Sequence, residues 1–240
     1  MFEKIEKLQI FYLGVLLALA LVISTRIVTR NFNNNVISVT GSAYEIVKSD
    51  SGTLNFDINV KSQNKQEAYN IAQNQIEIVK KYLSEKQIKN IELKTVNGYY
   101  SYKRNPKTGE YTDVPDVYNL TQPVTISSDN VELIKEISNS ITGLIDKGVD
   151  INAYAPSYDY SKLPDLKVSL LEKASKDAKA RATSMLKPTH NSVGKIQSVR
   201  MGVYQITPVD STNVSDMGIN DTSSIDKKVT AVANVSFKIK

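Results

Sequence analysis

The sequence predicts an α+β domain in which antiparallel strands form the sheet and helices pack on one face, preceded by one N-terminal transmembrane helix. Strand-like and helix-like segments follow each other in the order ββα, ββα, βα, ββ. Helices therefore lie between antiparallel neighbours, without the long βαβ alternation of a parallel sheet. A single apolar run stands near the N-terminus. The predicted boundaries are a signal-anchor over residues 1–30, a polar linker over 31–35 and the α+β domain over 36–240.

The apolar run covers residues 10–23 and contains no charged side chain. A helix needs roughly 17–25 apolar residues to span a bilayer core. The run reaches that length as residues 10–28, if two hydroxyl residues and a snorkelling Arg26 are placed at the interface. An uncleaved anchor is expected, because apolar residues continue beyond the small-residue site at 18–20, the wrong order for a cleavage region. A cleaved signal peptide and a buried core helix are the alternatives.

Composition narrows the function classes. The chain has no cysteine, which excludes disulfides, thiol nucleophiles and thiolate zinc sites. Lys plus Arg is 30 against 25 for Asp plus Glu, and this near balance is typical of a mixed soluble surface, not of a nucleic-acid footprint. The glycine motifs that bind phosphates or dinucleotides do not occur. No cofactor and no nucleic-acid partner are expected.

The first half of the domain begins with two strands, at residues 36–47 and 53–61, which are predicted to form a hairpin with its turn at 50–52. The second strand alternates apolar and polar residues without a break, which predicts one buried face. Gly41 interrupts the first strand and indicates a bulge or a close backbone approach. Asn64 is expected to cap a helix. The apolar stripe of that helix consists of Ala68, Ile71, Ala72, Ile76, Val79 and Leu83.

The middle of the domain is predicted as a hairpin followed by a second helix. Residues 91–102 and 110–126 are expected to be extended, with a turn at 105–109. Asp129 and Glu132 form a capping-box pattern, and Gly148 is expected to end the helix. The stripe of this helix consists of Val131, Ile134, Ile137, Ile141, Leu144 and Ile145.

The last part of the domain is predicted as an extended segment, a third helix and two strands. The third helix has Pro164 in its first turn and ends near Leu186. A long polar loop at 207–226 separates the final strands and is either a spacer or a partner-contacting segment. The extended segments are residues 149–160, 194–206 and 229–240.

The third helix carries a stripe of small residues, Ala174, Ala178 and Ala182. Small side chains at a spacing of four let a neighbouring element approach the helix closely, whether that neighbour is the domain's own sheet or another subunit. The three alanines are therefore a candidate oligomer contact, and a homo-oligomer is the expected assembly.

Tyrosines gather on the predicted hairpin. Aromatic residues interleaved with basic ones can bind single-stranded nucleic acid, but the balanced charge of the domain argues against it. Cross-strand aromatic packing and a protein interface are the remaining interpretations. The candidate surface-interaction residues are Tyr99, Tyr100, Tyr102, Tyr111 and Tyr118.

Candidate catalytic residues are sparse. The one histidine, His190, lies in a stretch rich in helix breakers, so any Ser-His or Cys-His dyad would have to be built on it. Asp113 with Asp116, and Asp159 with Asp165, are carboxylates close in sequence that flank prolines. Such pairs could cut a glycosidic bond but are more typical of turns. No catalytic, cofactor-binding or metal-ligating residue is predicted, and a hydrolase using scattered carboxylates is the alternative.

Four segments resemble the SIMPL-domain family of bacterial proteins. Residues 39–43 with 50–60 resemble its opening hairpin, and 99–126 its tyrosine-bearing hairpin. Residues 144–149 resemble its "LID" helix end. Residues 171–186 with 193–196 resemble its alanine-rich helix, which has the pattern A..DA..RA followed by a glycine and an isoleucine. The departures are in turns: Ser42 replaces a second glycine, Ser49-Asp50 a Pro-Asp pair, and Val117-Tyr118 a Gly-Tyr pair.

The resemblance covers about residues 36–240 and implies an exported α+β protein of the bacterial envelope. Some members assemble into ring-like homo-oligomers, and some are linked to oxidative-stress defence. It implies no catalytic residues. The resulting expectation is a single-pass protein of the bacterial inner membrane, held through residues 10–28. Its C-terminal domain is expected in the periplasm, acting by self-association and partner binding. A cleaved periplasmic form is the alternative.

Overall fold

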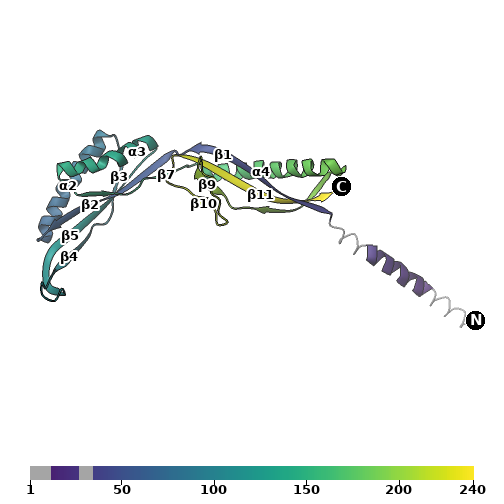
Figure 1. Cartoon of the computed structure of the whole chain (residues 1–240), viewed down its shortest axis with the longest axis horizontal. Helices are drawn as coiled ribbons and strands as arrows, with labels where there is room; N and C mark the ends of the chain where they lie inside the picture. Colours follow the sequence, from purple (N-terminus) through teal and green to yellow (C-terminus); the bar gives the residue numbers. More distant parts are fainter. Residues whose placement is uncertain (1–11, 27–34) are drawn as a thin grey trace, which may run out of the picture. The chain divides into compact units, whose positions relative to one another are not determined.

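The structure, a computed structural model, describes residues 12–26 and 35–240, and it has the mixed α+β architecture with antiparallel sheets that the sequence predicts (Figure 1). A helix covers residues 12–26. The elements that follow are β1 (Val36–Lys48), β2 (Ser51–Ser62), α2 (Lys65–Glu85), β3 (Asn90–Leu93), β4 (Asn97–Arg104), β5 (Tyr111–Ser128), α3 (Val131–Ser140), η1 (Ile141–Lys147), β6 (Ile151–Ala153), β7 (Ser157–Asp159), α4 (Leu163–Leu186), η2 (Lys187–Thr189), β8 (Val193–Met201), β9 (Gln205–Pro208), β10 (Ile219–Asn220) and β11 (Asp226–Ile239).

The chain divides into two compact units. Unit 1 comprises Met1–Ser42, Leu171–Gly202 and Val232–Lys240, and unit 2 comprises Ala43–Leu170 and Val203–Ala231. The segments of both units interleave along the chain within residues 36–240.

The predicted membrane span, residues 10–28, is described only over 12–26. Within the two described ranges, no helix is both long enough and apolar enough to cross a membrane. Residues 31–34 of the predicted linker lie outside the described residues.

A six-stranded sheet forms the body of unit 2. Its strands run in the order β3–β5–β2–β6, with β4 also on β5 and β7 also on β2, and all of these pairs are antiparallel. The alternation predicted for β2 is confirmed, because Leu54, Phe56 and Ile58 are fully buried. The predicted β1–β2 hairpin is wrong, since β1 belongs to a different, five-stranded sheet.

Helices α2 and α3 cover one face of the six-stranded sheet, as Figure 1 shows and as their shared apolar core with β2 and β5 requires. Asn64 caps α2 as predicted, accepting from the backbone amides of Gln66 and Glu67. The cap of α3 is Asn130 and not Asp129, since the Asn130 side chain accepts from the Leu133 amide at 3.2 Å.

The predicted stripe of the second helix fails at its end, where the α-helix gives way to the 3-10 turns of η1. Ile145 is 55% exposed, because three residues per turn rotate the buried face away from a 3.6-residue pattern. Gly148 ends η1 in the left-handed conformation, with φ of 83°, as predicted.

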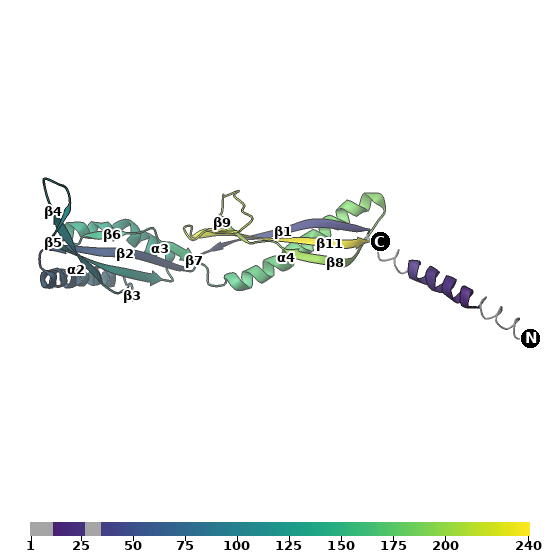
Figure 2. The ribbon, with the colours of Figure 1, turned by 90° about the horizontal axis from the view of Figure 1, so that it is seen from below.

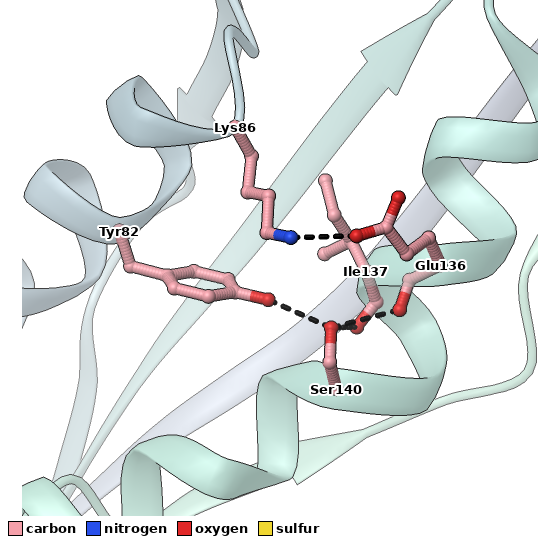
Figure 3. A network of polar contacts seen from close by, with 5 residues as sticks. All are labelled: Tyr82, Lys86, Glu136, Ile137 and Ser140. Carbon is pink, nitrogen blue, oxygen red and sulfur yellow. Dashed lines mark hydrogen bonds and ion pairs between the residues drawn. The ribbon is translucent and has the colours of Figure 1, made fainter.

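Polar contacts tie α2 to α3 (Figure 3). The hydroxyl of Ser140 donates to the carbonyl of Glu136 at 2.8 Å. The Tyr82 hydroxyl lies 2.8 Å from the same Ser140 oxygen and is therefore the donor in that contact. Lys86 pairs with the Glu136 carboxylate at 2.6 Å. Together these contacts fix the separation of the two helices that cover the sheet.

The five-stranded sheet has the order β1–β11–β9–β10, with β8 also on β11. Its one departure from the antiparallel prediction is the short parallel pair of β9 and β10. The predicted strand over residues 194–206 is two strands, β8 and β9, which pair with different parts of β11. In unit 1, α4 runs alongside β1 and β11 in both views (Figures 1 and 2).

Side chains from the flanking strands fasten the polar loop at 207–226. The Gln205 amide donates to the Ser215 carbonyl at 2.7 Å. Lys228 donates to the Ser211 carbonyl at 2.7 Å. Lys227, almost wholly buried, donates to the Asp221 carbonyl at 2.6 Å. Burial lowers the pKa of Lys227, and the nearby charge of Asp221 opposes that shift. The loop thus has defined attachment points and is not a free spacer.

Asp50 links the β1–β2 connection to the residues before α4 and makes stability pH-dependent. Its carboxylate accepts from the Ser161 hydroxyl at 2.6 Å and the Ser161 amide at 2.8 Å, and these hydrogen bonds lower the pKa of Asp50 below 3.8. A carboxylate with a lowered folded pKa adds stability above its unfolded value, and the folded protein loses it as the pH falls through the folded pKa.

We therefore expect Asp50→Asn to flatten the fall in stability below about pH 4. Urea unfolding of the wild type and the variant between pH 2 and 6 measures the difference. Asp113→Asn, a change at an exposed carboxylate, is the control. Parallel pH profiles for the wild type and Asp50→Asn would contradict the assignment.

Candidate protein-interaction surface

The candidate surface is a two-stranded ribbon built from β4 and the first part of β5. Arg104 pairs with Tyr111, and Tyr100 pairs with Tyr118. The pairing of β2 with β5 ends at Tyr118, so the ribbon has two strands beyond that point. Tyr99 and Tyr100 lie at its base, opposite Asn119 and Tyr118. Figure 2 shows it curling away from the end of the six-stranded sheet. We call residues 99–117 the tyrosine ribbon.

The tyrosine ribbon exposes a high density of aromatic surface. Tyr99 and Tyr111 are 67% and 68% exposed, and Tyr102 is 46% exposed. Tyr100 lies closer to the sheet at 37%. Tyrosine offers large contact area with few rotatable bonds, and it is enriched where proteins bind proteins. Four of the five predicted surface tyrosines therefore lie together on one accessible ribbon.

Specific contacts hold the ribbon in shape. An isolated two-stranded ribbon is marginally stable in water, so it needs support from its side chains. The Arg104 guanidinium lies 4.5 Å from the Tyr111 ring centroid and donates to the Tyr111 hydroxyl at 2.7 Å. Thr112 donates to the Lys103 carbonyl at 2.9 Å. At the turn, Gly109 adopts φ of 73°, a conformation that glycine adopts without strain.

Tyr118 corrects the predicted set, because it is a core residue and not a surface one. It is 5% exposed and packs in a cluster with Val60, Ala68, Ala72 and Leu120. Its ring meets the Tyr100 ring edge-on, with centroids 4.8 Å apart. A side chain at Gly98 would collide with the end of the Tyr118 ring. Tyr118 thus fixes the base of the ribbon to the core.

The alanine stripe lies inside one chain. Ala174, Ala178 and Ala182 are all fully buried. A Cβ atom at Gly41 of β1 would meet the Ala174 carbonyl and the Ala178 amide far inside van der Waals contact. Of the two neighbours considered for the stripe, the structure places the chain's own strand there. The close approach predicted at Gly41 is confirmed, and no second subunit is needed to cover these alanines.

The predicted carboxylate pairs do not meet in a cavity. A cavity of about 620 Å³ in unit 2 is lined by α3, by β7 and the residues before it, and by residues near both ends of the polar loop. Its carboxylates are Asp210 and Asp226. None of the four paired residues, Asp113, Asp116, Asp159 and Asp165, is among its lining.

His190 is the one imidazole in the chain. His190 is exposed and ends η2 with φ of 55°. Among the residues that the structure describes, no group of three or more His, Cys, Asp or Glu side chains could hold a metal ion. The arrangement with the clearest functional geometry is therefore the tyrosine ribbon, which is suited to binding.

The fold and the ribbon define a class of α+β proteins with an aromatic hairpin and an alanine-rich helix. The model of the SIMPL family, described as a protein of unknown function (DUF541), matches residues 37–237. The chain therefore belongs to the SIMPL family, as its resemblance to that family indicated. A comparison with curated proteins finds no match.

Proposed function

We propose that this SIMPL-family protein works by binding and self-association at the bacterial inner membrane, with its C-terminal units in the periplasm. The observation that carries the proposal is the tyrosine ribbon, whose aromatic side chains are exposed while their strands are held firmly. Exposed clustered aromatic side chains supply the interface residues that contribute most to association. The predicted carboxylate pairs, Asp113 with Asp116 and Asp159 with Asp165, do not line the cavity of unit 2. We therefore favour binding over hydrolysis as the activity.

The N-terminal segment supports membrane attachment. Its helix at residues 12–26 presents apolar side chains in every direction, and Leu16 and Leu21 are each 64% exposed. A helix that is apolar all round needs an apolar environment. We propose that this segment, over residues 10–28, lies in the bilayer as an uncleaved anchor. Envelope or oxidative-stress defence is the role that we propose for the assembly.

The ribbon replaces the alanine stripe as the proposed contact between copies or with a protein partner. The stripe is covered within the chain, whereas Tyr99, Tyr102 and Tyr111 are 67%, 46% and 68% exposed. Anchoring adds to this, because confinement to a membrane raises effective concentration and lets modest contacts assemble.

We expect the triple variant Tyr99→Ala, Tyr102→Ala and Tyr111→Ala to weaken association roughly a hundredfold, at about 1 kcal/mol or more for each interface tyrosine. Mass measurement and cross-linking of the full chain in membranes and after detergent extraction test this. Tyr44→Ala is the matched control, because Tyr44 is 64% exposed on β1 outside the ribbon.

Two outcomes would overturn parts of the proposal. An assembly mass unchanged by the triple variant would remove the ribbon from the interface. Intact-mass analysis of the same extract reports the N-terminus, and a mature chain beginning at Leu21 would replace the anchored protein with a cleaved periplasmic one.

A further inference from the structure

The two units carry opposite net charge. The described part of unit 1, residues 35–42, 171–202 and 232–240, holds nine Lys and Arg against two Asp and Glu, a net charge of +7. Unit 2 holds 17 against 21, a net charge of −4. The two acids of unit 1 are already paired, Glu172 with Lys176 and Asp177 with Arg181. The near balance of the whole chain therefore conceals a strongly basic unit.

Four of these cations belong to one end of unit 1. There the start of β8 joins the end of β11 through two backbone hydrogen bonds of 2.9 Å between Ser192 and Lys240. The Ile239 amide donates to the Asn35 carbonyl at 2.8 Å, so the start of β1 lies at the same end. We call this the basic end, and its exposed cations are Lys187, Lys195, Lys238 and Lys240.

The basic end is also where the N-terminal helix attaches. Eight residues, 27–34, connect that helix to Asn35, and an extended chain of eight residues spans at most about 28 Å. With the helix in a bilayer, as the proposed function requires, the basic end is held within that distance of the lipid surface.

We propose that the basic end docks on the anionic phospholipid headgroups of the membrane that holds the helix. A basic residue near an anionic membrane surface gains roughly fivefold in binding, corresponding to about 1 kcal/mol per charge. Strand β8 adds apolar side chains beside its cations, since Ile196 is 59% and Val199 52% exposed. The bilayer interface accepts both kinds of side chain together.

A second copy of the same end is a poorer occupant. The cations of one basic end would face those of the other, and like charges across an interface oppose association. The acidic unit 2 of another copy is the remaining protein candidate, and the experiment includes it as an outcome.

The test uses the full chain, reconstituted in vesicles of phosphatidylcholine alone or with about a third phosphatidylglycerol. Because the chain has no cysteine, Gln197→Cys on β8 provides one labelling site. Energy transfer from that label to a headgroup acceptor reports docking, provided that the dye pair has a transfer distance shorter than the reach of the linker. We expect strong transfer in the anionic vesicles, weak transfer in the neutral ones, and a loss at high salt, where the Debye length is about 3 Å.

Two matched variants distinguish an effect of the basic end from an effect of the protein's total charge. One variant should weaken docking at least a hundredfold, at roughly fivefold per lysine. It replaces with Gln the four lysines of the basic end, Lys187, Lys195, Lys238 and Lys240. The same change at Lys61, Lys81, Lys89 and Lys147, all exposed in unit 2, should leave transfer unchanged.

Vesicle flotation of the same samples distinguishes this proposal from the anchor. Failure to float with neutral vesicles contradicts the anchor, whereas flotation with transfer independent of lipid composition overturns docking alone. An assembly mass that falls in the basic-end variant, with transfer still independent of lipid, would assign the basic end to a second copy and overturn lipid docking.

Discussion

Replacing Gly41 with alanine is expected to lower the free energy of unfolding by roughly 3 kcal/mol, at the upper end of overpacking costs. In a chain of this size, that corresponds to a fall of about 6–12 °C in melting temperature. The reason is geometric. The new Cβ would lie 2.8 Å from the Ala178 Cα and closer still to the Ala174 carbonyl and the Ala178 amide. These are backbone atoms, so no side chain can rotate away.

Gly143→Ala is the matched control, because a Cβ there meets nothing within 4 Å and the residue has no positive φ. Thermal unfolding of the full chain in detergent, followed by circular dichroism, measures both variants. Ala178→Leu approaches the same contact from α4, and it should lower the melting temperature without a specific loss of assembly mass. Equal melting of Gly41→Ala and Gly143→Ala would show that β1 and α4 do not meet in this way.

Local patterns were predictable because their causes are local. The alternation of β2 sets its buried face, and Asn64 caps α2 with a side chain that reaches amides two and three residues on. Gly148 ends η1 because a left-handed residue is needed there. The Asp129 cap was wrong by one position, since both Asp129 and Asn130 carry suitable side chains and only the backbone geometry chooses between them.

Long-range pairing could not be predicted in the same way. Gly41 and the alanine stripe each indicated a close neighbour, but neither pattern showed that they are neighbours of each other. The residue types at positions 50–52 are typical of a hairpin turn, yet β1 and β2 belong to different sheets. The basic end was missed for the same reason, since Lys187, Lys195 and Lys238 come together only through the β8–β11 pairing.

One part of the site was present in the sequence pattern and was missed. Tyr118 shares its alternation with Leu120, Val124 and Ile126, which are all buried on the same face of β5. The period of two therefore assigns Tyr118 to the core. Tyr99 lies on β4 and Tyr111 at the start of β5, two stretches without such an apolar alternation, and both side chains are exposed.

The burial of Tyr118 leads to the second large effect that we expect, a loss of stability when its ring is removed. Tyr118→Ala should lower the melting temperature by roughly 6–20 °C, the cost of removing a buried aromatic ring from a chain of this size. The ring fills a cluster with Val60, Ala68 and Leu120 and contacts Tyr100 edge-on. Tyr118→Phe keeps the ring and should recover most of the loss.

Tyr111→Ala is the matched surface change on the same strand. Tyr111 is 68% exposed, and its main contact is the cation–π interaction with Arg104, so the melting temperature should change little. Association should behave in the opposite way, with assembly mass falling for Tyr111→Ala while the folded units keep their stability. Melting curves and assembly masses of the three variants test both halves. If Tyr118→Ala melted at the same temperature as Tyr111→Ala, Tyr118 would not be a core residue. The tyrosine ribbon would then lack the structural support that we assign to Tyr118.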